Sequence, residues 1–212
     1  RGYFTALLGF SVVETLALAG LFIDTLRRSL KNYGLDKGGL WVHSIMTAYG
    51  AQALATRHNR ALRDMAFTAG LIHDIGKVIM DRFLGEQFEA VINVVQSENI
   101  EFPIAEKKVL GFDHAEIGAM AAAKWKLAPE LVEAIQLHHL PTQAKMNRQL
   151  CGVVHVANCL CRMTGQGVGY DGMYFKLDEQ ALKDIGVKEG ETEEILGEML
   201  ERAQEAEKMF AG

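Results

Sequence analysis

The chain of 212 residues carries 22 Lys and Arg against 27 Asp and Glu, which gives a formal net charge of −5 at pH 7. This balance argues against a basic face for duplex nucleic acid, because neutralising the phosphates requires clustered cations. Hydrophobic residues make up 49% of the chain and charged residues 23%. Such a chain can bury a sizeable core, which excludes a disordered protein.

Apolar residues recur with helical spacing along nearly the whole chain, and only 3 prolines interrupt it. The pattern predicts helices at residues 4–10, 11–32, 38–57, 63–80, 84–98, 103–110, 114–126, 129–139, 148–163, 178–185 and 192–209. Residues 174–177 are the one candidate for a short strand. The sequence therefore predicts an all-α fold.

Several predicted helices carry start signals. Pro103 and Pro129 suit a first helical position, where the missing N–H is not needed. Asp113 followed by Glu116 predicts a capping box, which would begin a helix at His114.

Residues 165–172 hold four glycines and are predicted to form a flexible connection to a charged C-terminal helix. A phosphate-binding loop is the alternative interpretation. It is disfavoured because the segment follows a helix and lacks the GK[ST] ending.

Targeting and redox signals favour a cytoplasmic protein without membrane contact. The most apolar stretch, residues 16–23, is too short to span a bilayer, which takes about 20 residues. No signal-peptide pattern is visible. The cysteines form an odd set without CxxC spacing, which is typical of reduced thiols: Cys151, Cys159 and Cys161.

Six polar residues stand inside apolar stretches and are candidates for a metal site: His43, His73, Asp74, His114, His138 and His139. Residues 65–80 are apolar on nearly every side, so an ionised Asp74 buried there needs a cation or strong hydrogen bonds. On one helix, His73 and Asp74 would lie about 100° apart and could flank one metal. Lys77 would share their edge of the helix and could anchor a phosphate oxygen.

The other histidines fall on separate predicted helices. His138 and His139 lie in a last helical turn, whose partial negative charge favours a bound cation. Imidazole and carboxylate together suit Fe, Mn, Zn, Ni or Co better than Ca. Each histidine taken alone also fits a hydrogen-bonded core or surface position, and we expect His58 and His155 to lie outside the site.

The order His43, His73-Asp74, His114, His138-His139 resembles the H…HD…H…HH pattern of the HD superfamily of metal-dependent phosphohydrolases. More narrowly, LIHDIGK and the later GFDHAEIGAMAAAKWKLAPELVEAIQLHH resemble the HDOD family of bacterial signalling domains, over about residues 8–164. The resemblance implies an HD-like helical bundle at 1–164, whose first part is expected to lie upstream of this chain. Residues 165–212 would add the Gly-rich connection and C-terminal helices packed on the same domain.

The resemblance also implies roles for these residues. Asp74 would bridge two divalent transition-metal ions and, with Lys77 on the phosphate, carry catalysis. One ion would be held by His43 and His73, with Asn158 as a further candidate ligand, and the other by His114, His138 and His139.

Two departures from the superfamily pattern matter. Asn158 stands where the superfamily has an Asp, so the site would lack one negative charge. The GYP loop of the related HD-GYP phosphodiesterases is absent after His139, where LPTQAKMNRQL stands. Cleavage of a cyclic dinucleotide by the HD-GYP route is therefore unsupported.

Two functional hypotheses follow. The first is a metal-dependent phosphohydrolase acting on a phosphomonoester or phosphodiester, with nucleotides among its candidate substrates. The second is a catalytically silent signal-transduction module, which contacts signalling proteins and keeps a structural or vestigial metal site. The five histidines with Asp74 and Lys77 favour the first hypothesis, and Asn158 with the missing GYP loop favours the second.

Overall fold

The computed structural model describes residues 24–210 and places the helices around one central helix. The α-helices are α3 Gly39–His58, α4 Arg63–Ile72, α5 Ile75–Phe83, α6 Phe88–Glu98, α7 Phe102–Leu110, α8 His114–Lys124, α9 Pro129–Leu137, α10 Arg148–Met163, α11 Glu179–Ile185 and α12 Glu191–Phe210. Short 3-10 turns join them, and the described residues contain a single isolated bridge in place of strands. The predicted all-α class is confirmed. The predicted helix 4–10 and the apolar stretch 16–23 lie outside the described residues.

The predicted helix 11–32 is too long at its C-terminal end. In its described part the helix ends at residue 26, and a 3-10 turn, Lys31–Tyr33, follows. The chain reverses here because Leu30 and Leu35 exchange backbone hydrogen bonds around Gly34, which has a φ of 69°. Glycine adopts this left-handed conformation without steric cost.

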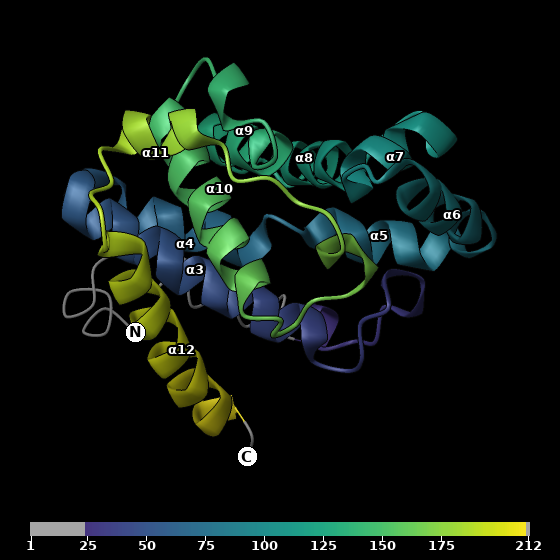
Figure 1. Cartoon of the computed structure of the whole chain (residues 1–212), viewed down its shortest axis with the longest axis horizontal. Helices are drawn as coiled ribbons and strands as arrows, with labels where there is room; N and C mark the ends of the chain where they lie inside the picture. The colour runs from purple at the N-terminus through teal and green to yellow at the C-terminus, as the bar shows by residue number, and fades with distance from the viewer. Residues whose placement is uncertain (1–23, 211–212) are drawn as a thin grey trace.

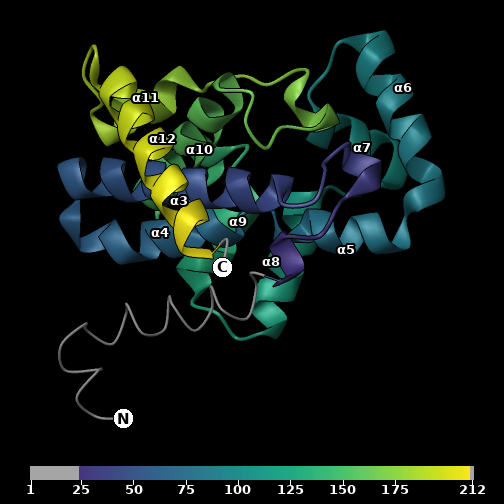
Figure 2. The same ribbon diagram turned by 90° about the horizontal axis from the view of Figure 1, so that it is seen from below.

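Helix α3 forms the centre of the core. It packs against α4, α10 and α12 (Figures 1 and 2). The approach of α4 to α3 requires Gly70, because a Cβ atom there would lie 2.7 Å from the Cα of Ala48. His43 is buried in the first turns of α3, so the packing of this helix fixes its position.

The sequence predicts one helix over residues 63–80, and this prediction is wrong. The structure divides the segment into α4 and α5, with His73 and Asp74 in the turn between them. The break lets the start of α5 press against α8: a Cβ atom on Gly76 would lie 1.9 Å from the carbonyl oxygen of His114. The turn, and not one face of a continuous helix, therefore sets the directions of the His73 and Asp74 side chains.

Helices α8 and α9 begin where the sequence predicts. Asp113 Oδ1 accepts a hydrogen bond from the Glu116 N–H at 2.8 Å, and Glu116 Oε2 accepts one from the Asp113 N–H at 3.2 Å. This capping box places His114 at the first position of α8. Pro129 opens α9 as expected.

The connection from α10 to α11 runs across the molecule to the region of α5 and returns (Figure 1). The expected strand at 174–177 is irregular, and the 3-10 turn Tyr170–Gly172 contacts α7. The glycines of this connection pack closely: a Cβ atom on Gly167 would lie 2.7 Å from the backbone nitrogen of His43, and one on Gly169 would lie 2.0 Å from the Tyr33 carbonyl oxygen. The segment predicted to be a flexible connection thus lies tightly against the start of α3.

The C-terminal helices pack on the rest of the chain, α11 on α10 and α12 on α3. Arg57 on α3 pairs with Glu194 at 3.0 Å and with Glu198 at 2.5 Å on α12. Among the described residues, no helix combines the length and apolar character that crossing a bilayer requires.

Candidate metal centre

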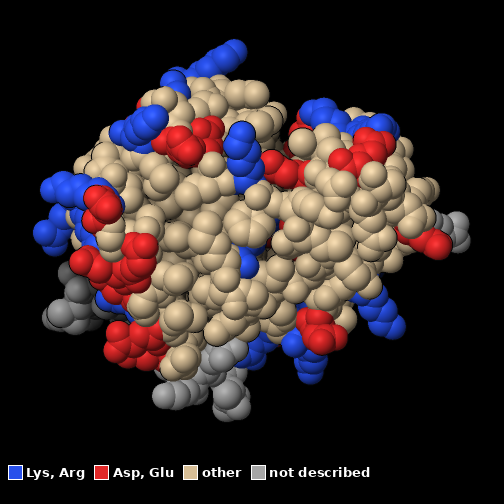
Figure 3. Space-filling model, in the orientation of Figure 1, with Lys and Arg blue, Asp and Glu red and all other residues tan. Residues whose placement is uncertain are grey.

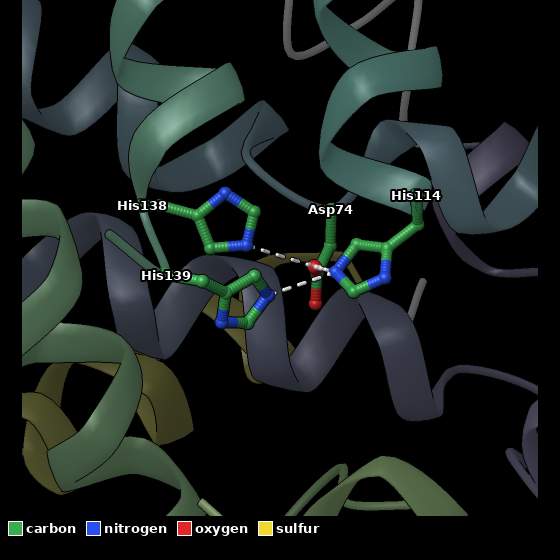
Figure 4. A group of neighbouring side chains, drawn as sticks. All are labelled: Asp74, His114, His138 and His139. Carbon is green, nitrogen blue, oxygen red and sulfur yellow. Dashed lines mark hydrogen bonds and ion pairs between the residues drawn. The ribbon is translucent and has the colours of Figure 1, made fainter. Parts of the chain in front are cut away.

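The six polar residues singled out in the sequence lie together in the structure, although they come from four parts of the chain. His43 projects from α3, His73 and Asp74 from the turn before α5, His114 from the start of α8, and His138 and His139 from the turn that follows α9. Figure 4 shows Asp74, His114, His138 and His139 pointing toward one another. Asp74 is fully buried and lies at the centre of the group.

The two carboxylate oxygens of Asp74 face different histidines. Oδ2 lies 3.4 Å from His43 Nε2 and 3.3 Å from His73 Nε2. Oδ1 lies 3.3 Å from His114 Nε2 and 3.6 Å from His138 Nε2. His139 completes the second group, with its Nε2 3.0 Å from that of His114. In each group the candidate ligand atoms lie within 4.8 Å of one another, as two half-sites sharing Asp74 would require.

Several atoms of the cluster are buried without a hydrogen-bond partner: His43 Nε2, His73 Nε2, His138 Nε2 and Asp74 Oδ1. Leaving a buried polar atom unsatisfied costs about 1–3 kcal/mol. Lone pairs from neutral imidazoles and a carboxylate are the ligands that Zn, Fe and related ions take. The residues therefore fit divalent transition metals, with His138 Nε2 and Asp74 Oδ1 available to one half-site and His43 Nε2 and His73 Nε2 available to the other.

Backbone carbonyls hold two of the imidazoles in the tautomer that a metal needs. His73 Nδ1 donates to the Gly70 carbonyl at 2.8 Å, and His138 Nδ1 donates to the Ile135 carbonyl at 2.7 Å. A carbonyl oxygen only accepts, so the proton stays on Nδ1 and the Nε2 lone pair faces Asp74.

His114 is held by a buried carboxylate that the sequence analysis missed. Glu106 on α7 accepts hydrogen bonds through Oε2 from His114 Nδ1 at 2.6 Å and from the His114 N–H at 3.0 Å. The Tyr33 hydroxyl donates to Glu106 Oε1 at 2.6 Å. The one signal in the sequence is that Glu106 stands four residues after Phe102, on the apolar face of its helix.

Protonation differs across the cluster. Burial lowers the pKa of His43 and of His138 to about 3, so both imidazoles are neutral at pH 7. Burial also lowers the pKa of His114, but Glu106 and Asp74 outweigh it and raise this pKa to about 9. Burial raises the pKa of Asp74, yet His73 and Lys77 hold it well below its usual range, which keeps the carboxylate ionised.

Lys77 is buried and its ammonium is engaged by two carboxylates. Nζ lies 2.5 Å from Asp74 Oδ2 and 2.5 Å from Oδ2 of Asp171, which also pairs with Arg162 at 3.2 Å. Neither Asp171, which lies in the Gly-rich connection, nor Arg162, which lies on α10, was predicted from the sequence. The phosphate-binding role of Lys77 stays a prediction.

Asn158 is buried on α10, and its Oδ1 has no hydrogen-bond partner. His58 and His155 lie outside the cluster: His58 binds Glu191 at 2.9 Å, and His155 Nδ1 donates to the His138 carbonyl at 2.8 Å. The cysteines are all free and buried, and Cys161 Sγ lies 3.4 Å from His43 Nδ1.

A cavity of about 730 Å³ adjoins the cluster between α7, α8, α9 and residues 176–180. Of the six candidate ligands, His139 lines it. Lys107, Lys108 and Lys176 line its wall together with acidic residues. Figure 3 shows that positively and negatively charged side chains both occur on this face of the molecule. The cavity gives the His114 half-site a route to bulk solvent.

An all-α fold with a buried His/Asp cluster, ordered H…HD…H…HH along the chain, defines the class of an HD-type helical domain. Residues 5–141 match the family model of the HDOD domain, so the chain belongs to the HDOD family. An uncharacterised protein of Treponema pallidum is 27% identical over 146 residues. That match covers 68% of this chain but 28% of the relative.

Solved structures show the same fold. An HDOD domain protein from Geobacter sulfurreducens has a TM-score of 0.69 at 23% identity, covering 92% of this chain and 63% of that one. A protein assigned to signal transduction from Marinobacter aquaeolei has a TM-score of 0.76 at 21% identity, covering 95% and 45%. A protein assigned as a phosphohydrolase from Shewanella amazonensis has 0.64 at 24% identity, covering 92% and 75%.

Proposed function

We propose that this HDOD chain binds one or two divalent transition-metal ions at the His/Asp cluster and hydrolyses a phosphomonoester or phosphodiester. The observation that carries the proposal is the set of buried imidazole and carboxylate atoms around Asp74 that lack hydrogen-bond partners. A bound divalent ion lowers the pKa of water and offsets the charge of a phosphoryl group.

The candidate ligands would form two half-sites that share Asp74. Asp74 offers one oxygen to each half-site, His43 and His73 serve one of them, and the second is served by His114, His138 and His139. Asn158 is a further candidate through its amide oxygen. This donor set suits Fe, Mn, Zn, Ni or Co.

The cavity beside His139 is the proposed substrate site. Its volume of about 730 Å³ lies in the range of small-molecule sites and admits a nucleotide-sized ligand. Lys107, Lys108 and Lys176 bring positive charge to its wall, and the exposed Ile104 and Leu140 offer apolar contacts. Lys107 pairs with Glu116 and Lys108 with Glu98, but both pairs are exposed, so a phosphate would compete for them more easily than for the buried Lys77.

The test begins with metal analysis of protein purified without a histidine tag. A screen of phosphomonoesters and phosphodiesters with added Mn²⁺ or Fe²⁺ follows. We expect bound metal and hydrolysis in the unmodified chain, loss of both in Asp74→Ala, and retention of both in His58→Ala. Absence of metal from the unmodified chain after reconstitution would contradict the proposal.

A catalytically silent signal-transduction module is the second candidate. The engagement of the Lys77 ammonium by Asp74 and Asp171 favours it, because that ammonium is not free to bind a phosphate. Bound metal with no hydrolysis of any phosphoester in the screen would support this candidate, and the partners would then be signalling proteins.

A further inference from the structure

The two carboxylate oxygens of Asp74 differ in their hydrogen-bond partners. Oδ1 lacks a hydrogen-bond partner and faces His114 and His138. Oδ2 bonds the ammonium of Lys77 at 2.5 Å while also facing the other two histidines. One half-site therefore holds an oxygen that faces imidazoles, which can release a proton and ligate a metal, and the other holds an oxygen bonded to an ammonium, which cannot ligate one.

Lys77 is fixed in this place by Asp171. The Asp171 carboxylate lies 2.5 Å from Lys77 Nζ, and Arg162 holds the same oxygen at 3.2 Å. The close packing of Gly169 against Tyr33 holds the segment before Asp171 in place. The ammonium is thus clamped between two buried carboxylates, much as a bridging metal ion would be.

We propose that Lys77, held by Asp171, is a resident cation that takes the place of a second metal ion at Asp74 Oδ2. The chain then binds one divalent ion tightly, at the half-site of His114, His138 and His139. This inference rests on the proposed metal centre and adds its stoichiometry. An ion bonded to Oδ2 at about 2 Å would face the ammonium across that oxygen. The two positive charges repel strongly in a buried site.

Access to solvent points to the same half-site. His139 lines the cavity of about 730 Å³, whereas His43 and His73 are buried away from it. The favoured half-site also offers more ligands, with three imidazoles against two. The charge next to Oδ2, the number of ligands and the access to solvent therefore all favour the half-site of His114, His138 and His139.

The test measures bound Mn²⁺ per full-length chain by elemental analysis, after reconstitution and removal of free ion. Electron paramagnetic resonance then separates isolated from spin-coupled Mn²⁺. We compare the unmodified chain with the double variant Lys77→Met, Asp171→Asn, which removes one charge of each sign. The matched control is Arg148→Met, Asp184→Asn, which removes an ion pair that lies outside the cluster and the cavity.

We expect one isolated Mn²⁺ in the unmodified chain and in the control, and two coupled Mn²⁺ in the double variant. Two ions in the unmodified chain would overturn this inference and leave the proposed function standing. One ion in a folded double variant would also overturn it, because Lys77 would then not exclude the second ion. No bound ion would contradict the proposed function itself. The unmodified chain alone decides the stoichiometry if the variant does not fold.

Discussion

Glu106 Oε2 lies 2.6 Å from Nδ1 of His114, and the same oxygen accepts the His114 backbone N–H at 3.0 Å. Both residues are fully buried, and Glu106 is held in turn by the Tyr33 hydroxyl. A carboxylate bonded to the far nitrogen of a ligating histidine fixes the ring and raises its basicity. Glu106 thus determines which nitrogen of His114 faces Asp74.

Replacing Glu106 should therefore weaken metal binding without touching a ligand. We expect Glu106→Gln to lower Mn²⁺ affinity about 10–100-fold, the usual effect of losing such a partner. Titration calorimetry measures the change. Glu98→Gln serves as the control, because Glu98 pairs with Lys108 at the surface and should leave the affinity unchanged. Equal affinity in Glu106→Gln would show that His114 needs no such support.

Restoring a carboxylate at position 158 should raise metal occupancy. Asp74 is the only carboxylate in the two candidate ligand groups found among the described residues, and neutral imidazoles do not offset the charge of a bound ion. We expect Asn158→Asp to hold more metal than the unmodified chain, as measured by elemental analysis. Asn147→Asp, at the N-cap of the same helix, is the control. Unchanged occupancy with a lower melting temperature would instead make Asn158 a structural residue.

The metal-free protein should be most stable near pH 6.5. An unfolded histidine has a pKa of about 6.5. Folded His43 and His138 have pKa values of about 3, so the unfolded chain gains protons first and stability falls as the pH drops from 6.5 toward 3. Folded His114 has a pKa of about 9, so stability also falls as the pH rises from 6.5 toward 9.

Melting temperatures in the presence of a chelator measure this dependence. We expect decreasing values on both sides of the maximum, with a smaller acid-side decrease in His138→Asn. A melting temperature that rises steadily from pH 5 to pH 9 would contradict the assignment for His114.

A methyl group at Gly76 should separate α5 from α8. A Cβ atom there would lie 1.9 Å from the His114 carbonyl oxygen and 2.7 Å from the Gly118 nitrogen. Overpacking of this kind costs about 1–3 kcal/mol of unfolding free energy or more, and it would displace Asp74 from His114. Denaturant unfolding measures the loss.

The matched substitution is Gly197→Ala in α12, where nothing lies within 4 Å of the added atom. A helical Gly→Ala change there should stabilise by about 1 kcal/mol. A stable, fully metal-loaded Gly76→Ala variant would show that the α5–α8 contact is not needed for the site.

Local rules in the sequence determined the helical class and many of the helix positions. Helical periodicity predicted α10, the capping box of Asp113 and Glu116 predicted the start of α8, and Pro129 predicted the start of α9. These signals act within a few residues, so they can be read without knowing the fold. The order of histidines around His73-Asp74 likewise selected the residues that lie together, because polar groups in apolar stretches require buried partners.

Contacts between distant segments were decided by the tertiary structure alone. The turn at His73 and Asp74 lets the start of α5 lie against α8, and helical periodicity cannot predict this contact. Asp171 meets Lys77 from 94 positions away, and its own glycine-rich surroundings give no sign of a buried anion. A sequence shows which groups are costly to bury unpaired, but the chain path decides which partners reach them.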